Sequence, residues 1–130
     1  MNRWGIWGGI FGGLGVIAGA IGAHALQASS LPAPSHELFR TAVTYQLIHA
    51  LALFALGTLP PASLNRPLRL AGLLWSTGIV LFCGTLYTLA LYGERPFPMS
   101  APIGGSALIL AWFVAAIGVA WRVRGTLPKE

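Results

Sequence analysis

Three polar side chains recur at every fourth position inside an otherwise apolar stretch. They are Thr41, Tyr45 and His49, and Gln46 lies beside them. Residues spaced by four share one face of an α-helix. Polar side chains at membrane depth are unfavourable unless they are paired, and they usually face the interior of a helix bundle. Histidine titrates near neutral pH and is a frequent ligand. This stripe therefore predicts a site of hydrogen bonding or of binding.

Other polar residues and glycines fall where the remaining apolar stretches can bring them close to this stripe. Two interpretations follow from the residue types. In the first, His49 and Gln46 bond to Thr85, Tyr87 or backbone carbonyls and fix the packing of the helices. In the second, a small pocket is lined by His24, Tyr45, Gln46 and His49. The candidate cluster contains His24, Thr41, Tyr45, Gln46, His49, Thr85, Tyr87, Gly104 and Gly105.

The same region has features that attract a small polar or anionic ligand. Two predicted helices begin there, and unpaired N–H groups give a helix N-terminus a partial positive charge. Arg40 is nearby, and Pro102 with Gly104-Gly105 leaves the backbone at the second helix start approachable. We therefore predict that this cluster, in the extracytoplasmic half of the bundle, binds or transports a small polar molecule, an ion or a lipid headgroup. A structural or assembly protein that packs through the first helix is the alternative.

Residue patterns typical of catalysis or of cofactor binding are missing from the sequence. The apolar stretches contain no Asp or Glu, so a paired acid/base site or a carboxylate proton relay is not expected. One cysteine, Cys83, rules out an internal disulfide. Ser106 has no defined base and is interpreted as a packing residue. A haem held by His24 and His49 ranks last. We predict no catalytic residue, no metal site and no cofactor.

The elements that must position these residues are four apolar stretches at about 4–26, 38–59, 70–92 and 102–121. Each is close to the ~20 residues that a helix needs to cross a bilayer. Hydrophobic residues make up 55% of the 130 residues and charged residues 8%, against about 25% charged in a soluble domain. The sequence predicts one domain over 1–130: an all-α membrane protein with four transmembrane helices in a compact bundle, in contact with the lipid bilayer.

Charge predicts how this bundle is oriented. The net charge is +5, but the basic residues lie at helix ends, where they indicate orientation rather than nucleic-acid binding. The first and third connections carry Arg40 and Arg95, accompanied by Glu37 and Glu94. By the positive-inside rule, both termini are predicted to be cytoplasmic. The termini and the second connection carry Arg3, Arg66, Arg69, Arg122, Arg124 and Lys129.

Glycines line one face of the first stretch. This stretch could be a cleaved signal peptide instead of a retained helix, because Arg3 precedes the apolar run and Ala23-His24-Ala25 resembles a cleavage site. A glycine face instead lets another helix approach closely, which favours a retained helix. The length of this face makes a homo-oligomer plausible. The predicted packing residues are Gly8, Gly12, Gly15, Gly19 and Gly22.

Four motifs, one in each stretch, occur in the order found in a known family. They are Gly19–His24; Thr41-Ala42 with Tyr45-Gln46 and His49–Ala52; Leu81–Tyr87 with Leu89–Leu91; and Pro102–Gly105 with Ala111-Trp112. The chain resembles the bacterial domain-of-unknown-function 423 family, and animal transmembrane protein 256 is similar at a greater distance. The departures are small: Cys83 stands where a serine is expected, and Ala101 where a threonine often precedes the proline. The resemblance implies a retained first helix and a multi-pass protein of the bacterial cytoplasmic (inner) membrane, without supplying an activity.

Overall fold

Two asparagines start helices at the same end of the molecule. In the computed structural model, which describes residues 1–126, helix α1 (Arg3–Ile21) begins after Asn2, whose side-chain oxygen accepts the N–H of Trp4 at 3.0 Å. Helix α3 (Arg66–Gly78) begins after Asn65, whose side-chain oxygen accepts the N–H of Leu68 at 3.1 Å. Asparagine is favoured at this position because its oxygen pairs with an N–H group that the helix leaves free.

Prolines and a glycine set the other helix boundaries. Helix α2 (Ala33–Thr58) has Pro34 in its first turn and stops before Pro60, and a short 3-10 turn follows at Pro61–Ser63. Helix α4 (Gly84–Tyr92) stops at Gly93, whose φ of 73° suits glycine. Helix α5 (Ser100–Thr126) completes the described chain.

Two π-helical turns extend these helices into four continuous spans. The turn Gly22–Leu26 prolongs α1, and the turn Ile79–Cys83 joins α3 to α4. The spans are Arg3–Leu26, Ala33–Thr58, Arg66–Tyr92 and Ser100–Gly125, each long and apolar enough to cross a membrane. The predicted four-helix membrane fold is confirmed. The second and third spans begin earlier than predicted because proline is compatible with the first turn of a helix.

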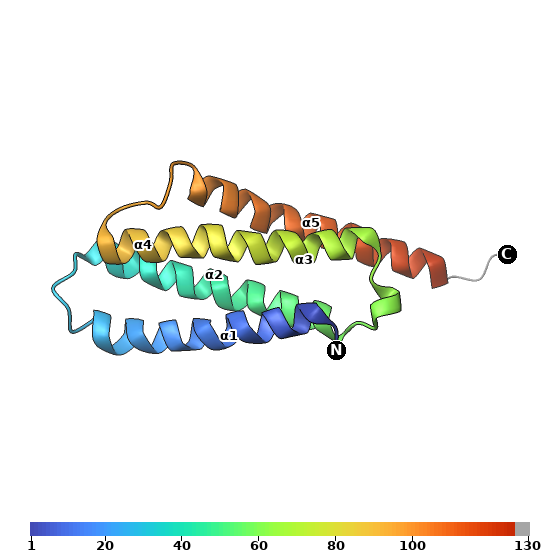
Figure 1. Cartoon of the computed structure of the whole chain (residues 1–130), viewed down its shortest axis with the longest axis horizontal. Helices are drawn as coiled ribbons and strands as arrows, with labels where there is room; N and C mark the ends of the chain where they lie inside the picture. Colours follow the sequence, from blue (N-terminus) through green and yellow to red (C-terminus); the bar gives the residue numbers. More distant parts are fainter. Residues whose placement is uncertain (127–130) are drawn as a thin grey trace.

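The spans are arranged as two packed pairs. Helix α1 lies along α2, α3 with the following π-helical turn lies along α5, and α2 packs on α3 and α4 between the pairs (Figure 1). Within the described residues, α1 and α5 do not form a packed pair. Residues 1–2, the 59–65 connection and the end of α5 lie at one end, here called the terminal end. The connections 27–32 and 93–99 lie at the opposite, loop end.

Glycines bring the helices of each pair close together. A side chain at Gly8 would overlap the backbone of Phe54, and one at Gly104 would overlap the backbone of Phe82. The glycines of the first span that are predicted to pack all face α2. Beyond Gly8, a Cβ atom at Gly15 would lie 2.8 Å from Leu47, at Gly22 3.1 Å from Phe39, at Gly19 3.5 Å from Val43 and at Gly12 3.9 Å from Ala50.

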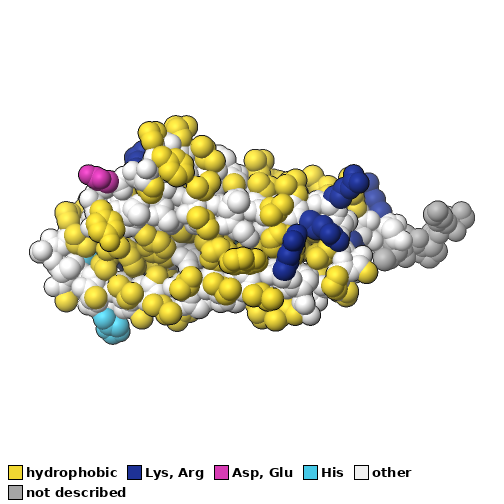
Figure 2. All heavy atoms as spheres, in the orientation of Figure 1, with side chains coloured by type: hydrophobic (Ala, Val, Ile, Leu, Met, Phe, Trp, Pro, Cys, Tyr) yellow, Lys and Arg dark blue, Asp and Glu magenta, His cyan; other side chains and the backbone are white. Residues whose placement is uncertain are grey.

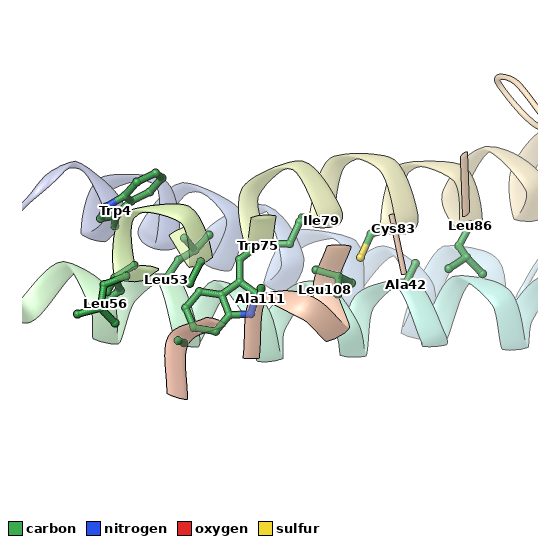
Figure 3. Packing of buried hydrophobic residues seen from close by; sticks show 13 residues of the cluster. Trp4, Ala42, Leu53, Leu56, Trp75, Ile79, Cys83, Leu86, Leu108 and Ala111 are labelled. Carbon is green, nitrogen blue, oxygen red and sulfur yellow. The ribbon is translucent and has the colours of Figure 1, made fainter. Parts of the chain in front are cut away.

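Buried apolar side chains fill the space between the two pairs along the length of the molecule. Figure 3 shows Trp75 and Ile79 of α3 and its extension beside Leu108 and Ala111 of α5. Outside this core the apolar side chains face outward, as the hydrophobic surface in Figure 2 shows. Leu51 is 69% exposed and Phe113 is 66% exposed. This outer surface suits a lipid environment.

Candidate functional site

Gln46 connects three helices. Its amide nitrogen donates to the backbone carbonyl of Phe11 on α1 at 2.9 Å. Its side-chain oxygen accepts the hydroxyl of Tyr87 on α4, also at 2.9 Å. The side chain is only 6% exposed. Buried amides need partners for both ends of the group, and Gln46 has a partner at each end.

The π-helical turn before α4 determines which way Tyr87 points. A π-helical turn adds a residue to the helix and rotates every side chain that follows it. Beyond this turn at Ile79–Cys83, Tyr87 faces α2, where its ring also packs edge-on against Phe39 with centroids 4.9 Å apart. The turn therefore directs Tyr87 toward Gln46. In an uninterrupted α-helix, the Tyr87 side chain would point in another direction.

His49 lies in an aromatic row rather than in a hydrogen-bonded network with Gln46. Its Nδ1 is 2.6 Å from the carbonyl oxygen of Tyr45, and because a carbonyl only accepts, Nδ1 donates. Its ring lies 5.9 Å from Tyr45 and 6.1 Å from Trp112 of α5, centroid to centroid. Trp112 in turn meets Trp75 edge-on at 5.1 Å. His49 is 5% exposed, so rings enclose it.

Thr85 pairs with a residue that sequence reasoning missed. Its hydroxyl lies 2.7 Å from that of Ser100, the first residue of α5. The Ser100 hydroxyl donates to the carbonyl of Phe97 at 2.9 Å. A serine at the start of an apolar stretch is the signal that would have identified it. The pair joins α4 to α5 at the loop end.

The structure does not bring His24 to the other polar residues. Its side chain is exposed in the π-helical turn Gly22–Leu26 at the loop end, whereas Gln46 and His49 are buried. The predicted pocket lined by His24, Tyr45, Gln46 and His49 is therefore not formed as a unit. The reason is that His24 follows Gly22, which lies against Phe39 near the start of α2. Gln46 and His49 lie about two to three helical turns further along α2.

The other predicted members have different surroundings. Thr41 and Tyr45 line a shallow hollow of about 380 Å³ with Glu37, Arg40 and Thr44. A second hollow of about 390 Å³ lies on the other side of Arg40 and is lined partly by Gly19, Gly22 and Gln27. Gly104 and Gly105 pack against Phe82 and contribute to helix contact.

Two asparagines join helices at the terminal end, and sequence reasoning did not assign them this role. The amide of Asn2 donates to the carbonyls of Leu56 and Leu59 at 3.0 and 2.9 Å. The amide of Asn65 donates to the carbonyl of Gly118 at 2.7 Å. Both residues also start a helix and both precede an arginine, which is the sequence signal they share.

A larger apolar groove of about 660 Å³ runs between α2 and α5 in the half of the molecule nearer the terminal end. We refer to it as the α2–α5 groove. Its lining includes Ala52 and Leu56 of α2, Leu68 and Trp75 of α3, and Ala116 and Val119 of α5. Over residues 1–126, no group of three or more His, Cys, Asp or Glu side chains is placed to hold a metal ion.

Sequence comparisons show that this chain is similar to bacterial membrane proteins. The sequence model of the family described as protein of unknown function (DUF423) matches residues 18–105. A UPF0382 membrane protein of Staphylococcus saprophyticus is 39% identical over 106 residues, which cover 81% of this chain and 86% of that protein. The UPF0382 membrane protein YwdK of Bacillus subtilis is 35% identical over 105 residues, covering 80% and 85%. The UPF0382 inner membrane protein YgdD of Escherichia coli is 30% identical over 113 residues, covering 87% and 86%. No solved structure matches the chain.

Proposed function

This chain belongs to the DUF423 family of membrane proteins, and we propose that it is a structural protein of the bilayer, in which hydrogen bonds of polar side chains fix the packing of the helices. The observation that carries the proposal is the pairing of Gln46 with Phe11 on α1 and Tyr87 on α4. A side chain that is occupied in this way supports packing rather than the capture of a polar molecule. If these hydrogen bonds were broken, the bilayer would offer no water to pair with the freed polar groups.

The remaining polar residues of the cluster support the same interpretation. The hydroxyls of Thr85 and Ser100 bond to each other, and His49 Nδ1 bonds within its own helix. A ligand that used Gln46 or Tyr87 would have to break an existing interhelical bond, which offsets what the new bond contributes. Binding or transport through this cluster, which the sequence favoured, is therefore the second choice.

Native mass spectrometry of the detergent-purified protein, combined with its melting temperature, tests the proposal. We expect Gln46→Leu to lower the melting temperature, and the exposed Gln27→Leu to leave it unchanged. We expect no stoichiometric small polar molecule to co-purify. A polar molecule that is present in the wild type and absent from Gln46→Leu, at an unchanged melting temperature, would instead establish a binding site.

The same spectra count the subunits of the proposed assembly. A homo-oligomer remains part of this proposal, but the glycine face of α1 is occupied by α2. Self-association would therefore have to use the outward faces of the helices. A subunit number of one in mild detergent and in nanodiscs would contradict the homo-oligomer and leave the structural role intact.

The two hollows beside Arg40 favour a second candidate function, the binding of a small anion at the loop end. Arg40 lies between them and brings a positive charge to backbone and hydroxyl groups. Inorganic phosphate should then raise the melting temperature of the wild type and of Arg95→Gln, but not of Arg40→Gln. Equal responses in all three proteins would remove this candidate.

A cofactor-carrying enzyme is the least supported of the three functional classes. The two histidines considered as haem ligands lie apart, since His24 is exposed in its π-helical turn and His49 is buried among aromatic rings. Absorbance spectra recorded during titration with haem test this class. A Soret shift that disappears in His49→Ala would restore it.

The proposed localisation is the cytoplasmic (inner) membrane, with both termini in the cytoplasm. Support comes from the five described arginines at the terminal end, Arg3, Arg66, Arg69, Arg122 and Arg124; Lys129, which the sequence count included, lies outside the described residues. Cys83 is buried, so single cysteines can report accessibility in a Cys83→Ser background. An impermeant maleimide added to intact spheroplasts should label Ser30→Cys and spare Ala62→Cys. The reverse pattern would invert the orientation.

A further inference from the structure

The α2–α5 groove has small side chains in its walls on both helices. Alanines occupy its walls at Ala52 and Ala55 on α2 and at Ala116 and Ala120 on α5, while Trp75 of α3 contributes to its lining. From Trp112 to Ala120 it extends about 12 Å along α5, at 1.5 Å per residue. An open apolar groove of this length suits a stretch of hydrocarbon chain rather than a compact polar solute.

The groove reaches the terminal end of the second span. Leu59, which follows the last residue of α2, and Leu68, in the first turn of α3, line its outlet at the terminal end. A hydrocarbon chain that enters there comes from a molecule whose polar part lies at the membrane surface. Glycerophospholipids have this arrangement, because their acyl chains start at the interface.

Arginines gather around this outlet. Arg122 and Arg124 follow the last groove residues of α5, Val119 and Ala120, by about one helical turn. Arg69 directly follows Leu68, and its Nε donates to the carbonyl of Leu64 at 3.0 Å. Figure 2 shows basic side chains gathered toward the terminal end.

The loop end has a different charge balance. Its two arginines, Arg40 and Arg95, are accompanied by Glu37 and Glu94, which are the acidic residues among those described. The outlet of the groove therefore lies in the part of the described molecule that has positive charge without neighbouring negative charge. An anionic phosphate is complementary to it, and a zwitterionic headgroup is less so.

We propose that the α2–α5 groove is a seat for one anionic glycerophospholipid, with an acyl chain in the groove and the phosphate beside Arg122 and Arg124. The proposal adds a binding site to the structural role argued above and does not depend on the Gln46 pairing. The apolar lining holds the acyl chain, and the arginines select the headgroup.

The test measures lipid binding to the purified full chain by native mass spectrometry. The probes are dioleoyl phosphatidylglycerol and dioleoyl phosphatidylcholine, which differ only in the headgroup. We expect one tightly bound phosphatidylglycerol per chain, held about tenfold more tightly than phosphatidylcholine and weakened by added salt.

Two variants separate the groove from the charge. Ala116→Phe fills the groove and should reduce the affinity for both lipids about tenfold or more; Ala20→Phe, at an exposed alanine of α1, is its control. The double variant Arg122→Gln, Arg124→Gln should weaken phosphatidylglycerol about tenfold or more and leave phosphatidylcholine unchanged. Its control is Arg40→Gln, Arg95→Gln at the loop end.

Three results would overturn the proposal. The first is equal binding of the two lipids by the wild type. The second is unchanged phosphatidylglycerol binding in Ala116→Phe, and the third is adduct numbers that rise without saturation, as expected for surrounding lipid only. Because Ala116 is exposed, Ala116→Phe should melt like the wild type in lipid-free detergent. That measurement separates loss of the seat from loss of the fold.

Discussion

The α1–α2 pair and the α3–α5 pair are held together by the same devices, although their sequences differ. In each pair an asparagine starts the first helix and donates its amide to a carbonyl of the second, Asn2 to Leu56 and Asn65 to Gly118. Each pair also has a glycine that allows backbone contact, Gly8 against Phe54 in one pair and Gly104 against Phe82 in the other.

The joint between the two pairs uses other means. It depends on large buried side chains such as Leu53 and Trp75 and on the hydrogen bond between Gln46 and Tyr87. The difference teaches that close backbone approach and an asparagine bonded to the partner backbone form each pair, whereas interdigitated side chains and one bond between two side chains fix how the pairs meet. Each part of this comparison can be tested separately by substitution.

The largest effect is expected where a methyl group would meet backbone. Gly8→Ala and Gly104→Ala should each lower the free energy of unfolding by about 3 kcal/mol, because a Cβ atom would overlap main-chain atoms of the partner helix. The measurement is SDS-induced unfolding in mixed micelles, followed by tryptophan fluorescence.

The neighbouring glycines are matched controls for these substitutions. Gly9 has open space around its Cβ position, and Gly105 has ordinary contact distances of 3.5 Å to Phe82. Alanine is the better helix former, so Gly9→Ala and Gly105→Ala should be neutral or stabilising by up to about 1 kcal/mol. If the variants at Gly8 and Gly9 behaved alike, backbone contact would not be what forms the pair.

This glycine contrast also shows how far the sequence leads. Spacing alone predicts the face formed by Gly8, Gly12 and Gly15, because helical periodicity is local. Hydropathy predicts the four spans, and the family resemblance that the motifs carry is confirmed. Charge predicts an orientation that stays a prediction.

The joint between the pairs could not be predicted in the same way. Which partners Gln46 finds depends on the π-helical turn at Ile79–Cys83, a one-residue change of register with no clear local signal. The exposure of His24 depends likewise on the turn at the end of α1. Asn2 and Asn65 look like ordinary helix caps until the partner helix is in place.

The second prediction concerns this joint. Gln46→Leu should lower the free energy of unfolding by about 2 kcal/mol, because two interhelical bonds are lost and the half-buried hydroxyl of Tyr87 loses its partner. A double-mutant cycle with Tyr87→Phe isolates the side-chain bond and should give a coupling of about 0.6 to 1.7 kcal/mol. Tyr92→Phe, at a side chain that is 77% exposed, serves as the control. A coupling of zero would mean that apolar packing alone sets the joint.

The third prediction compares the two asparagines. Asn65→Ala should lower the free energy of unfolding by about 1.5 kcal/mol, since both a helix cap and a bond to α5 are removed. Asn65→Ser retains a good cap and should lose only about 0.6 kcal/mol. Asn2→Ala and Asn2→Ser should show the same order if the pairs are alike. An Asn65→Ser variant as unstable as Asn65→Ala would assign the whole effect to the bond with Gly118.

The smallest effect is expected at the hydroxyl pair between α4 and α5. Thr85→Val keeps the shape of the side chain and removes its bond to Ser100, whose own hydroxyl retains the carbonyl of Phe97. The free energy of unfolding should therefore fall by only about 0.6 kcal/mol. Thr77→Val, where the exposed hydroxyl bonds only to carbonyls of its own helix, should change it by less. A Thr85→Val effect as large as that of Gln46→Leu would show that a buried side-chain pair contributes as much within the α3–α5 pair as at the joint, and the contrast between pairs and joint would then fail at the loop end.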